Sequence, residues 1–89
     1  MGAASGTRYD LGPAVILPGY INVHSHLELT ALADRITGFS DFVDWIRQLV
    51  TLKREMDDAA FARSIRDGAA EMLQSGITTV GDIITRLPS

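Results

Sequence analysis

The stretch that decides the fold is residues 20–26, which read YINVHSH. Its first half predicts a β-strand, because aromatic and β-branched side chains suit a pleated, half-buried surface. Side chains two positions apart on a strand share a face, so His24 and His26 are expected to point the same way. Two imidazoles aimed together can bind one divalent ion, with metal–nitrogen distances of about 2.1 Å. The alternative is two histidines placed close together in a loop by chance.

The residues before this strand are expected to form a separate segment. Residues 14–17 (AVIL) are a short apolar run that predicts a strand, and Pro18-Gly19 fits the central positions of a type II turn. We therefore divide the chain into an irregular N-terminal segment that ends in this strand, residues 1–17, and a main part, residues 18–89.

The residues after His26 predict a loop and then a helix. Residues 27–37 show no regular period and are expected to be a loop that can hold one helical turn. Ser40 is the expected N-cap of the first helix, and apolar side chains recur at helical spacing over residues 42–52.

A second helix and a second strand complete the pattern. Asp57 or Asp58 is expected to cap the helix, whose apolar stripe runs over residues 61–73, and Gly76 is expected to end it. The β-branched residues 77–80 predict the strand, which Gly-Asp is expected to interrupt before it can continue.

The order strand, helical crossover, strand is a βαβ unit, which pairs its strands in parallel. Parallel strands need cover on both faces, and two or three short strands cannot provide it. The sequence therefore predicts an α/β fold that is the opening part of something larger.

Composition excludes several classes of protein. With 46% hydrophobic and 21% charged residues, the chain is globular rather than disordered. Its net charge of −3 and scattered basic residues argue against nucleic acid as a partner. There is no cysteine, so a metal must be held by imidazole or carboxylate.

No targeting segment is expected either. Residues 1–6 lack the basic start and apolar core of a signal peptide, and no apolar run approaches the roughly 20 residues that span a membrane. We expect a cytoplasmic protein with no membrane partner.

Two segments carry a family resemblance. Residues 16–28 (ILPGYINVHSHLE) resemble the entry segment of the amidohydrolase superfamily, whose members open their barrel with Leu-Pro-Gly, two apolar residues, Asn, a small residue and His-x-His. Residues 76–82 (GITTVGD) resemble the second barrel strand of the same enzymes. The likeness extends from about residue 10 to the end, and is strongest to the aminohydrolase and chlorohydrolase branch, which includes many deaminases.

The resemblance implies a fold and a chemistry. The fold is a metal-dependent (β/α)₈ TIM-barrel hydrolase, of which this chain holds the first βα unit and the second strand. Residues 1–17 then contain the last strand of a small β-domain. His24 and His26 are implied to bind a divalent metal ion, zinc or iron, together with further ligands from later strands.

The implied reaction is hydrolysis of a C–N bond other than a peptide bond by metal-activated water. Deamination of a nitrogen heterocycle, a small-molecule substrate, is the expected form of this reaction. The general acid and base residues and the remaining ligands are not in this fragment. Because a catalytic zinc site normally uses three protein ligands, the fragment alone is expected to be inactive.

Three other residues each have a functional and a structural interpretation, and a fourth has only a structural one. Glu28 is a candidate to contact substrate or to hydrogen-bond a histidine, and the alternative is that it is a solvated carboxylate in a loop. Trp45 is a candidate to stack on a flat substrate, and the alternative is that it packs with the other apolar side chains of residues 42–52. Asp82 either faces the barrel mouth or begins a turn. Asn22 is expected to satisfy backbone groups.

Two rival functions belong to other classes. The chain can be a small non-catalytic protein that self-associates and reuses the barrel segment as an interaction surface, because strand edges and apolar helix faces favour association. It can also be a metal carrier that uses His24 and His26 alone, although two neutral imidazoles bind loosely.

Overall fold

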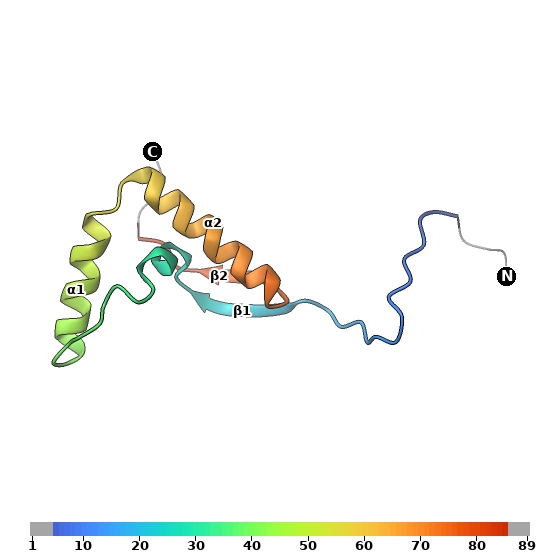
Figure 1. Ribbon diagram of the computed structural model, residues 1–89, viewed down its shortest axis with the longest axis horizontal. Coiled ribbons are helices and arrows are strands. Elements are labelled where there is room, and N and C mark those ends of the chain that lie inside the picture. Colours follow the sequence, from blue (N-terminus) through green and yellow to red (C-terminus); the bar gives the residue numbers. More distant parts are fainter. Residues whose placement is uncertain (1–4, 86–89) are drawn as a thin grey trace.

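The computed structural model describes residues 5–85 (Figure 1). The elements in chain order are β1 (Tyr20–Ser25), the 3-10 helix η1 (Leu27–Leu32), α1 (Phe42–Arg54), α2 (Asp58–Gln74) and β2 (Ile77–Asp82). The strands β1 and β2 and both α-helices lie where the sequence predicts such elements, whereas the strand predicted at residues 14–17 is absent. The first four and last four residues lie outside the described part of the chain.

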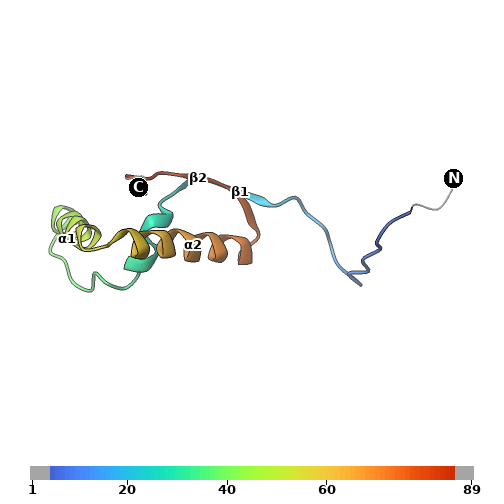
Figure 2. The same ribbon diagram turned by 90° about the horizontal axis from the view of Figure 1, so that it is seen from above.

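The sheet consists of β1 and β2, which pair in parallel as the βαβ pattern predicts. Figure 2 shows α1, α2 and η1 on one side of the sheet and no element on the other side. Apolar side chains of β1 are consequently exposed, with Ile21 at 66% and Val23 at 82%. A parallel sheet is normally covered on both faces, and residues 5–85 cover only one face of this sheet.

The small core lies between η1 and α2. Phe61 and Leu32 are the buried apolar residues, and Ser64 and Gly68 are buried on the same face of α2. The Ser64 hydroxyl accepts a hydrogen bond from the Ala31 amide (2.8 Å) and donates one to a carbonyl of η1. These contacts explain why a segment without a helical period is nevertheless helical: it is shaped by α2.

The caps of both helices are aspartates. α1 is capped by Asp41, whose carboxylate accepts from the Asp44 amide at 2.8 Å, so the prediction of Ser40 as the N-cap is wrong by one residue. Aspartate and serine cap about equally well, and the local sequence does not separate them. At α2 the cap is Asp57, which accepts from the Ala60 amide at 2.7 Å.

Gly76 ends α2 as predicted, with a φ of 86° and an amide that donates to the Leu73 carbonyl. Glycine adopts this left-handed conformation without a steric penalty. The predicted interruption of the second strand is wrong, because β2 runs through Gly81 to Asp82. Residues 83–85 do not continue the strand.

The predicted type II turn at Pro18-Gly19 is also wrong. That turn needs a positive φ at the glycine, and Gly19 does not have one. Glycine is required there for another reason, because a Cβ at this position would overlap the side chain of Thr78 in the neighbouring strand.

The chain before β1 runs away from the helices as an extended arm (Figure 1). The prediction of a strand at residues 14–17 is wrong, because these residues are exposed and lie outside any strand, with Val15 at 84% exposure. The assignment of residues 1–17 to a small β-domain stays a prediction. With this arm, the Cα radius of gyration is 19.1 Å, against about 12 Å for a compact domain of this length.

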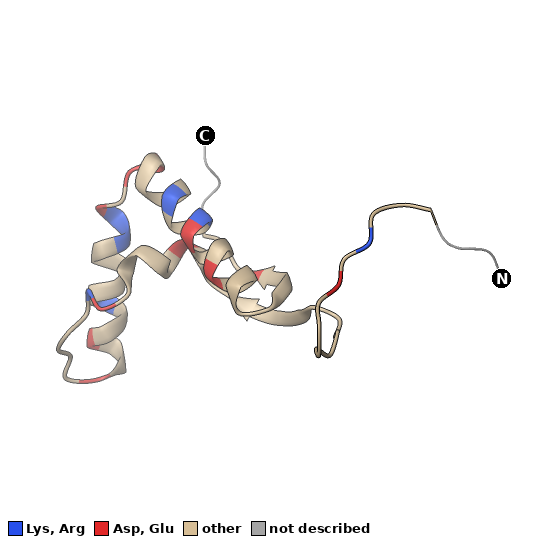
Figure 3. Ribbon diagram, turned by 45° about the vertical axis from the view of Figure 1, so that its right-hand side comes forward, with Lys and Arg blue, Asp and Glu red and all other residues tan. Residues whose placement is uncertain are grey.

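Charge is mixed over the surface. Figure 3 shows basic and acidic residues interspersed on α1 and α2. Within residues 5–85, no helix has the length and apolar character that crossing a membrane requires. The exclusion of nucleic acid as a partner stays a prediction.

Candidate metal centre

The two histidines lie together at the carboxyl end of β1. Their Nε2 atoms are 3.2 Å apart, and the ring centroids are 5.1 Å apart with an interplanar angle of 71°. Both side chains are exposed. The prediction that they point the same way is confirmed, while their role as metal ligands stays a prediction.

A β-bulge in β1 sets the direction in which the two histidine side chains point. Asn22 pairs with Val80 and Ser25 pairs with Asp82, so β1 advances three residues where β2 advances two. Such an extra residue reverses the alternation of side chains that follow it.

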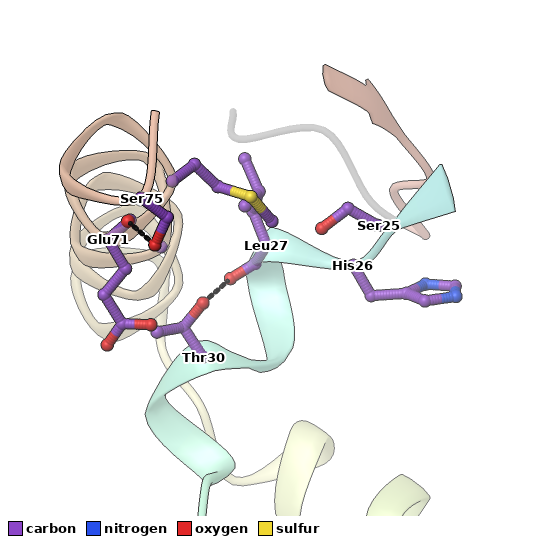
Figure 4. Close-up of a pocket in the computed structure, with 8 residues that line it drawn as sticks. Ser25, His26, Leu27, Thr30, Glu71 and Ser75 are labelled. Carbon is purple, nitrogen blue, oxygen red and sulfur yellow. Dashed lines mark hydrogen bonds between the residues drawn. The ribbon is translucent and has the colours of Figure 1, made fainter. Parts of the chain in front are cut away.

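The reversal separates the histidines from the side chains that face α2. The Asn22 amide contacts the sulfur of Met72 in α2 at 3.8 Å, and Ser25 lines a pocket against α2. Figure 4 shows Ser25 pointing into this pocket and the His26 ring pointing out of it. Without the bulge, His24 would share the face of Asn22 and turn toward α2.

Asn22 also satisfies the backbone at the bulge, as predicted. Its Oδ1 accepts a hydrogen bond of 3.1 Å from the His24 amide. The His24 amide, at the bulge, therefore has a hydrogen-bond acceptor.

Asp82 lies at the matching end of β2. Its Oδ1 accepts a hydrogen bond of 2.8 Å from the Leu27 amide, and the amide of the next residue, Ile83, donates to the Ser25 carbonyl at 2.8 Å. The end of β2 thus holds the backbone on both sides of His26. The sequence placed Asp82 at a strand end, but nothing in it indicated this partner.

Glu28 is buried, with 1% of its surface exposed, so its interpretation as a solvated loop carboxylate is wrong. Its Oε1 accepts hydrogen bonds from Lys53 Nζ (2.5 Å) and from the Thr85 hydroxyl (2.8 Å). Its Oε2 accepts from the Thr85 amide at 3.1 Å. Burial raises the pKa of Glu28, but the hydrogen bonds from Lys53 and Thr85 outweigh it and hold the pKa below its ordinary value.

These contacts engage both carboxylate oxygens of Glu28 within the protein. A role in substrate binding stays a prediction. Neither partner of Glu28 was predicted from the sequence. Lys53 lies in the last turn of α1, 25 positions from Glu28, and Thr85 lies 57 positions from it, so no local pattern joins them.

Trp45 is half-buried on α1, and its ring stacks on that of Phe42 with centroids 6.0 Å apart and planes at 20°. It lines a groove between α1 and the residues of η1, whereas His26 borders a different pocket, between η1 and α2. This placement supports the packing interpretation. A contact between Trp45 and a substrate stays a prediction.

The histidine pair fits half of a metal site. Two nitrogen atoms 3.2 Å apart, each about 2.1 Å from one ion, would subtend about 100° at it, between octahedral and tetrahedral angles. Within residues 5–85, no three His, Cys, Asp or Glu side chains lie close enough to hold an ion together. The described residues therefore offer two ligands and leave the others to be supplied from elsewhere.

Comparison with known proteins gives a consistent picture. Residues 15–88 match the amidohydrolase family. The chain is 33% identical over 82 residues to an imidazolonepropionase of Mycolicibacterium smegmatis, covering 86% of this chain and 21% of that protein. It is 31% identical over 78 residues to a 5-methylthioadenosine/S-adenosylhomocysteine deaminase of Nitratidesulfovibrio vulgaris, covering 83% and 17%. A deaminase of the same name from Natronomonas pharaonis is 27% identical over 90 residues, covering 97% and 20%.

No solved structure matches the chain significantly. The chain spans about a fifth of the length of the relatives it matches. Amidohydrolases have a TIM-barrel fold and generally use a divalent metal ion, and a parallel βαβ unit with paired histidines at a strand end is consistent with part of such a barrel. With the match extending over most of its residues, this chain belongs to the amidohydrolase family.

Proposed function

We propose that this chain supplies the first metal-binding strand of a hydrolase that cleaves C–N bonds other than peptide bonds. His24 and His26 are two of the metal ligands. The observation that carries the proposal is the 3.2 Å separation of their Nε2 atoms at the carboxyl end of a parallel strand. In (β/α)₈ enzymes the active site is built at that end of the strands.

A zinc or iron ion held there would supply the chemistry of water activation and polarisation of the substrate. The protein's part is to present two imidazoles on the same side of the strand. The bulge at residues 22–25 lets the pair point away from the pocket against α2, as Figure 4 shows for the His26 ring, and the opposite face of the sheet is not covered by the described residues. On that face a substrate and the remaining ligands can approach.

The substrate we propose is a nitrogen heterocycle that loses an amino group. Support comes from relatives that are named deaminases of adenosine-containing compounds. The 89-residue chain has only two ligands in its described part, and a catalytic zinc normally needs three. We therefore propose that the chain by itself does not turn over substrate. Its cytoplasmic location also stays a prediction.

Metal binding is tested by calorimetric titration of the chain with Zn²⁺, followed by histidine ring NMR spectra. The sequence has two histidines and no cysteine, so every imidazole signal belongs to the proposed site. Zinc should shift both rings together, and His24→Ala and His26→Ala should each abolish the binding heat. Asp67→Ala, which removes an exposed carboxylate of α2, is the control. Binding that survives the loss of either histidine would refute the site.

The reaction is tested by grafting. Residues 15–88 would replace the matching segment of the Nitratidesulfovibrio vulgaris deaminase, and ammonia release from 5-methylthioadenosine would be followed. The graft should retain its metal and activity and lose both with His24→Ala, while thermal melting shows that each variant folds. A folded graft with native histidines that holds no metal would contradict the proposal. The chain alone, assayed with added zinc, should release no ammonia above the blank.

A second candidate function is supported by the uncovered face of the sheet. A small non-catalytic protein would cover this face by self-association, because exposed apolar strands favour it. Size-exclusion chromatography with light scattering separates the two proposals. A discrete oligomer that unfolds cooperatively and binds no zinc supports the second, and zinc binding that requires both histidines supports the first.

A further inference from the structure

We propose that Asp82 is a positioning residue for the histidine pair. Its carboxylate, at the end of β2, fixes the backbone of β1 where His26 leaves the sheet and so keeps the His26 ring facing His24. This inference rests on the proposed function, because the property that it explains is metal binding by the pair.

The starting observation is that His26 lies one residue beyond β1 and is the N-cap of η1. Residues at this position commonly use their own side chain to accept from the first amides of the helix. The His26 side chain makes no such cap bond. Its imidazole is instead directed to His24, with 3.2 Å between the Nε2 atoms.

Asp82 takes over the capping that His26 does not perform. The Leu27 amide is the first of η1, and it donates to Asp82 Oδ1 at 2.8 Å across 55 positions of sequence. The adjacent Ile83 amide donates to the Ser25 carbonyl, also at 2.8 Å. The residues before and after His26 are therefore both tied to the end of β2, so the His26 side chain is not needed to cap η1.

Direct ligation is the rival role for Asp82. Two observations argue against it. Its Oδ1 is already engaged by the Leu27 amide. Among residues 5–85, no acidic side chain joins the two histidines in a group of three that could hold one ion. An asparagine at position 82 retains an oxygen that can accept from the Leu27 amide, but this oxygen is uncharged and is a poor zinc ligand, so the variant distinguishes the two roles.

The experiment compares Asp82→Ala, Asp82→Asn and the control Asp67→Ala in the 89-residue chain. Amide hydrogen exchange without metal reports the bond at Leu27, calorimetric titration with Zn²⁺ reports the site, and circular dichroism reports folding. We expect Asp82→Ala to lose protection at Leu27 and to bind zinc about tenfold more weakly, at the lower end of the effect of residues that orient ligands. Asp82→Asn and Asp67→Ala should keep both the protection and the affinity.

Each other outcome overturns the inference in a distinguishable way. An unprotected Leu27 amide in the wild-type chain would show that its hydrogen bond to Asp82 does not form. Protection that is lost in Asp82→Ala without a change in affinity makes the contact purely structural. Equal loss of affinity in Asp82→Asn and Asp82→Ala, with Leu27 still protected in the asparagine variant, makes Asp82 a ligand. A wild-type chain that shows the Leu27 protection but binds no zinc refutes the proposed function instead.

Discussion

Lys53, in the last turn of α1, donates a hydrogen bond to the buried carboxylate of Glu28 in η1. Thr85, three residues beyond β2, donates to the same carboxylate through its amide and its hydroxyl. Three segments of the chain that are distant in sequence therefore meet at one side chain, two positions after His26.

Replacement of Lys53 by methionine should destabilise the chain. It leaves the buried Glu28 carboxylate without its cation, although Thr85 still donates two hydrogen bonds to it. Loss of one partner of a buried polar group costs about 1–3 kcal/mol, and more when the group is charged. Urea unfolding followed by circular dichroism measures the loss. The double variant Lys53→Met, Glu28→Gln should recover part of it, because the buried charge is gone.

Arg54→Met is the matched control for Lys53. It removes a neighbouring cation of the same helix turn that is exposed, and such changes usually stay within about 0.5 kcal/mol. Equal losses of stability in the two variants would show that the contact with Glu28 contributes nothing.

Replacement of Ser64 by alanine should loosen η1. The buried hydroxyl accepts from the Ala31 amide and donates to the Glu28 carbonyl, both at 2.8 Å. Its loss leaves the Ala31 amide and the Glu28 carbonyl without this partner, which should lower the free energy of unfolding by about 1–3 kcal/mol. Hydrogen exchange should become faster at Ala31. Ser75→Ala is the control, because that exposed hydroxyl donates only within its own helix end; an unchanged Ala31 amide in the Ser64 variant would contradict the role of the hydroxyl.

Replacement of Gly68 by alanine should destabilise the contact between α2 and η1. Alanine favours the helix by up to about 1 kcal/mol, but overpacking a tight contact costs about 1–3 kcal/mol. A Cβ at Gly68 would overlap the hydroxyl of Thr30 and approach Leu27 to 3.1 Å. Thermal melting measures the net effect, and adding Thr30→Ala should relieve it. A stabilised single variant would show that η1 can move aside.

A charge on the uncovered face of β1 should suppress the self-association proposed above as the second candidate function. Val23 is 82% exposed, and a lysine there opposes the stacking or pairing of strands. Val15→Lys is the control, because Val15 is equally accessible at 84% but lies in the arm outside the sheet. Light scattering should show a smaller mass for Val23→Lys alone; equal masses for the two variants would place the association elsewhere.

Much of the architecture was determined by the sequence itself. Strand propensity before the histidines, the apolar periods of two helices and the Gly76 stop are local signals, each contained within one element. The common direction of His24 and His26 was predicted in the same way, from the two-residue repeat of a strand.

Only the tertiary structure decided what happens where segments meet. The 3-10 conformation of η1 depends on Ser64 of α2, the burial of Glu28 depends on Lys53 and Thr85, and the anchoring of His26 depends on Asp82. The bulge that turns the histidines away from α2 is a mismatch of register between two strands. These features arise from hydrogen bonds between residues tens of positions apart, and a pattern read along one segment contains no information about its distant partner.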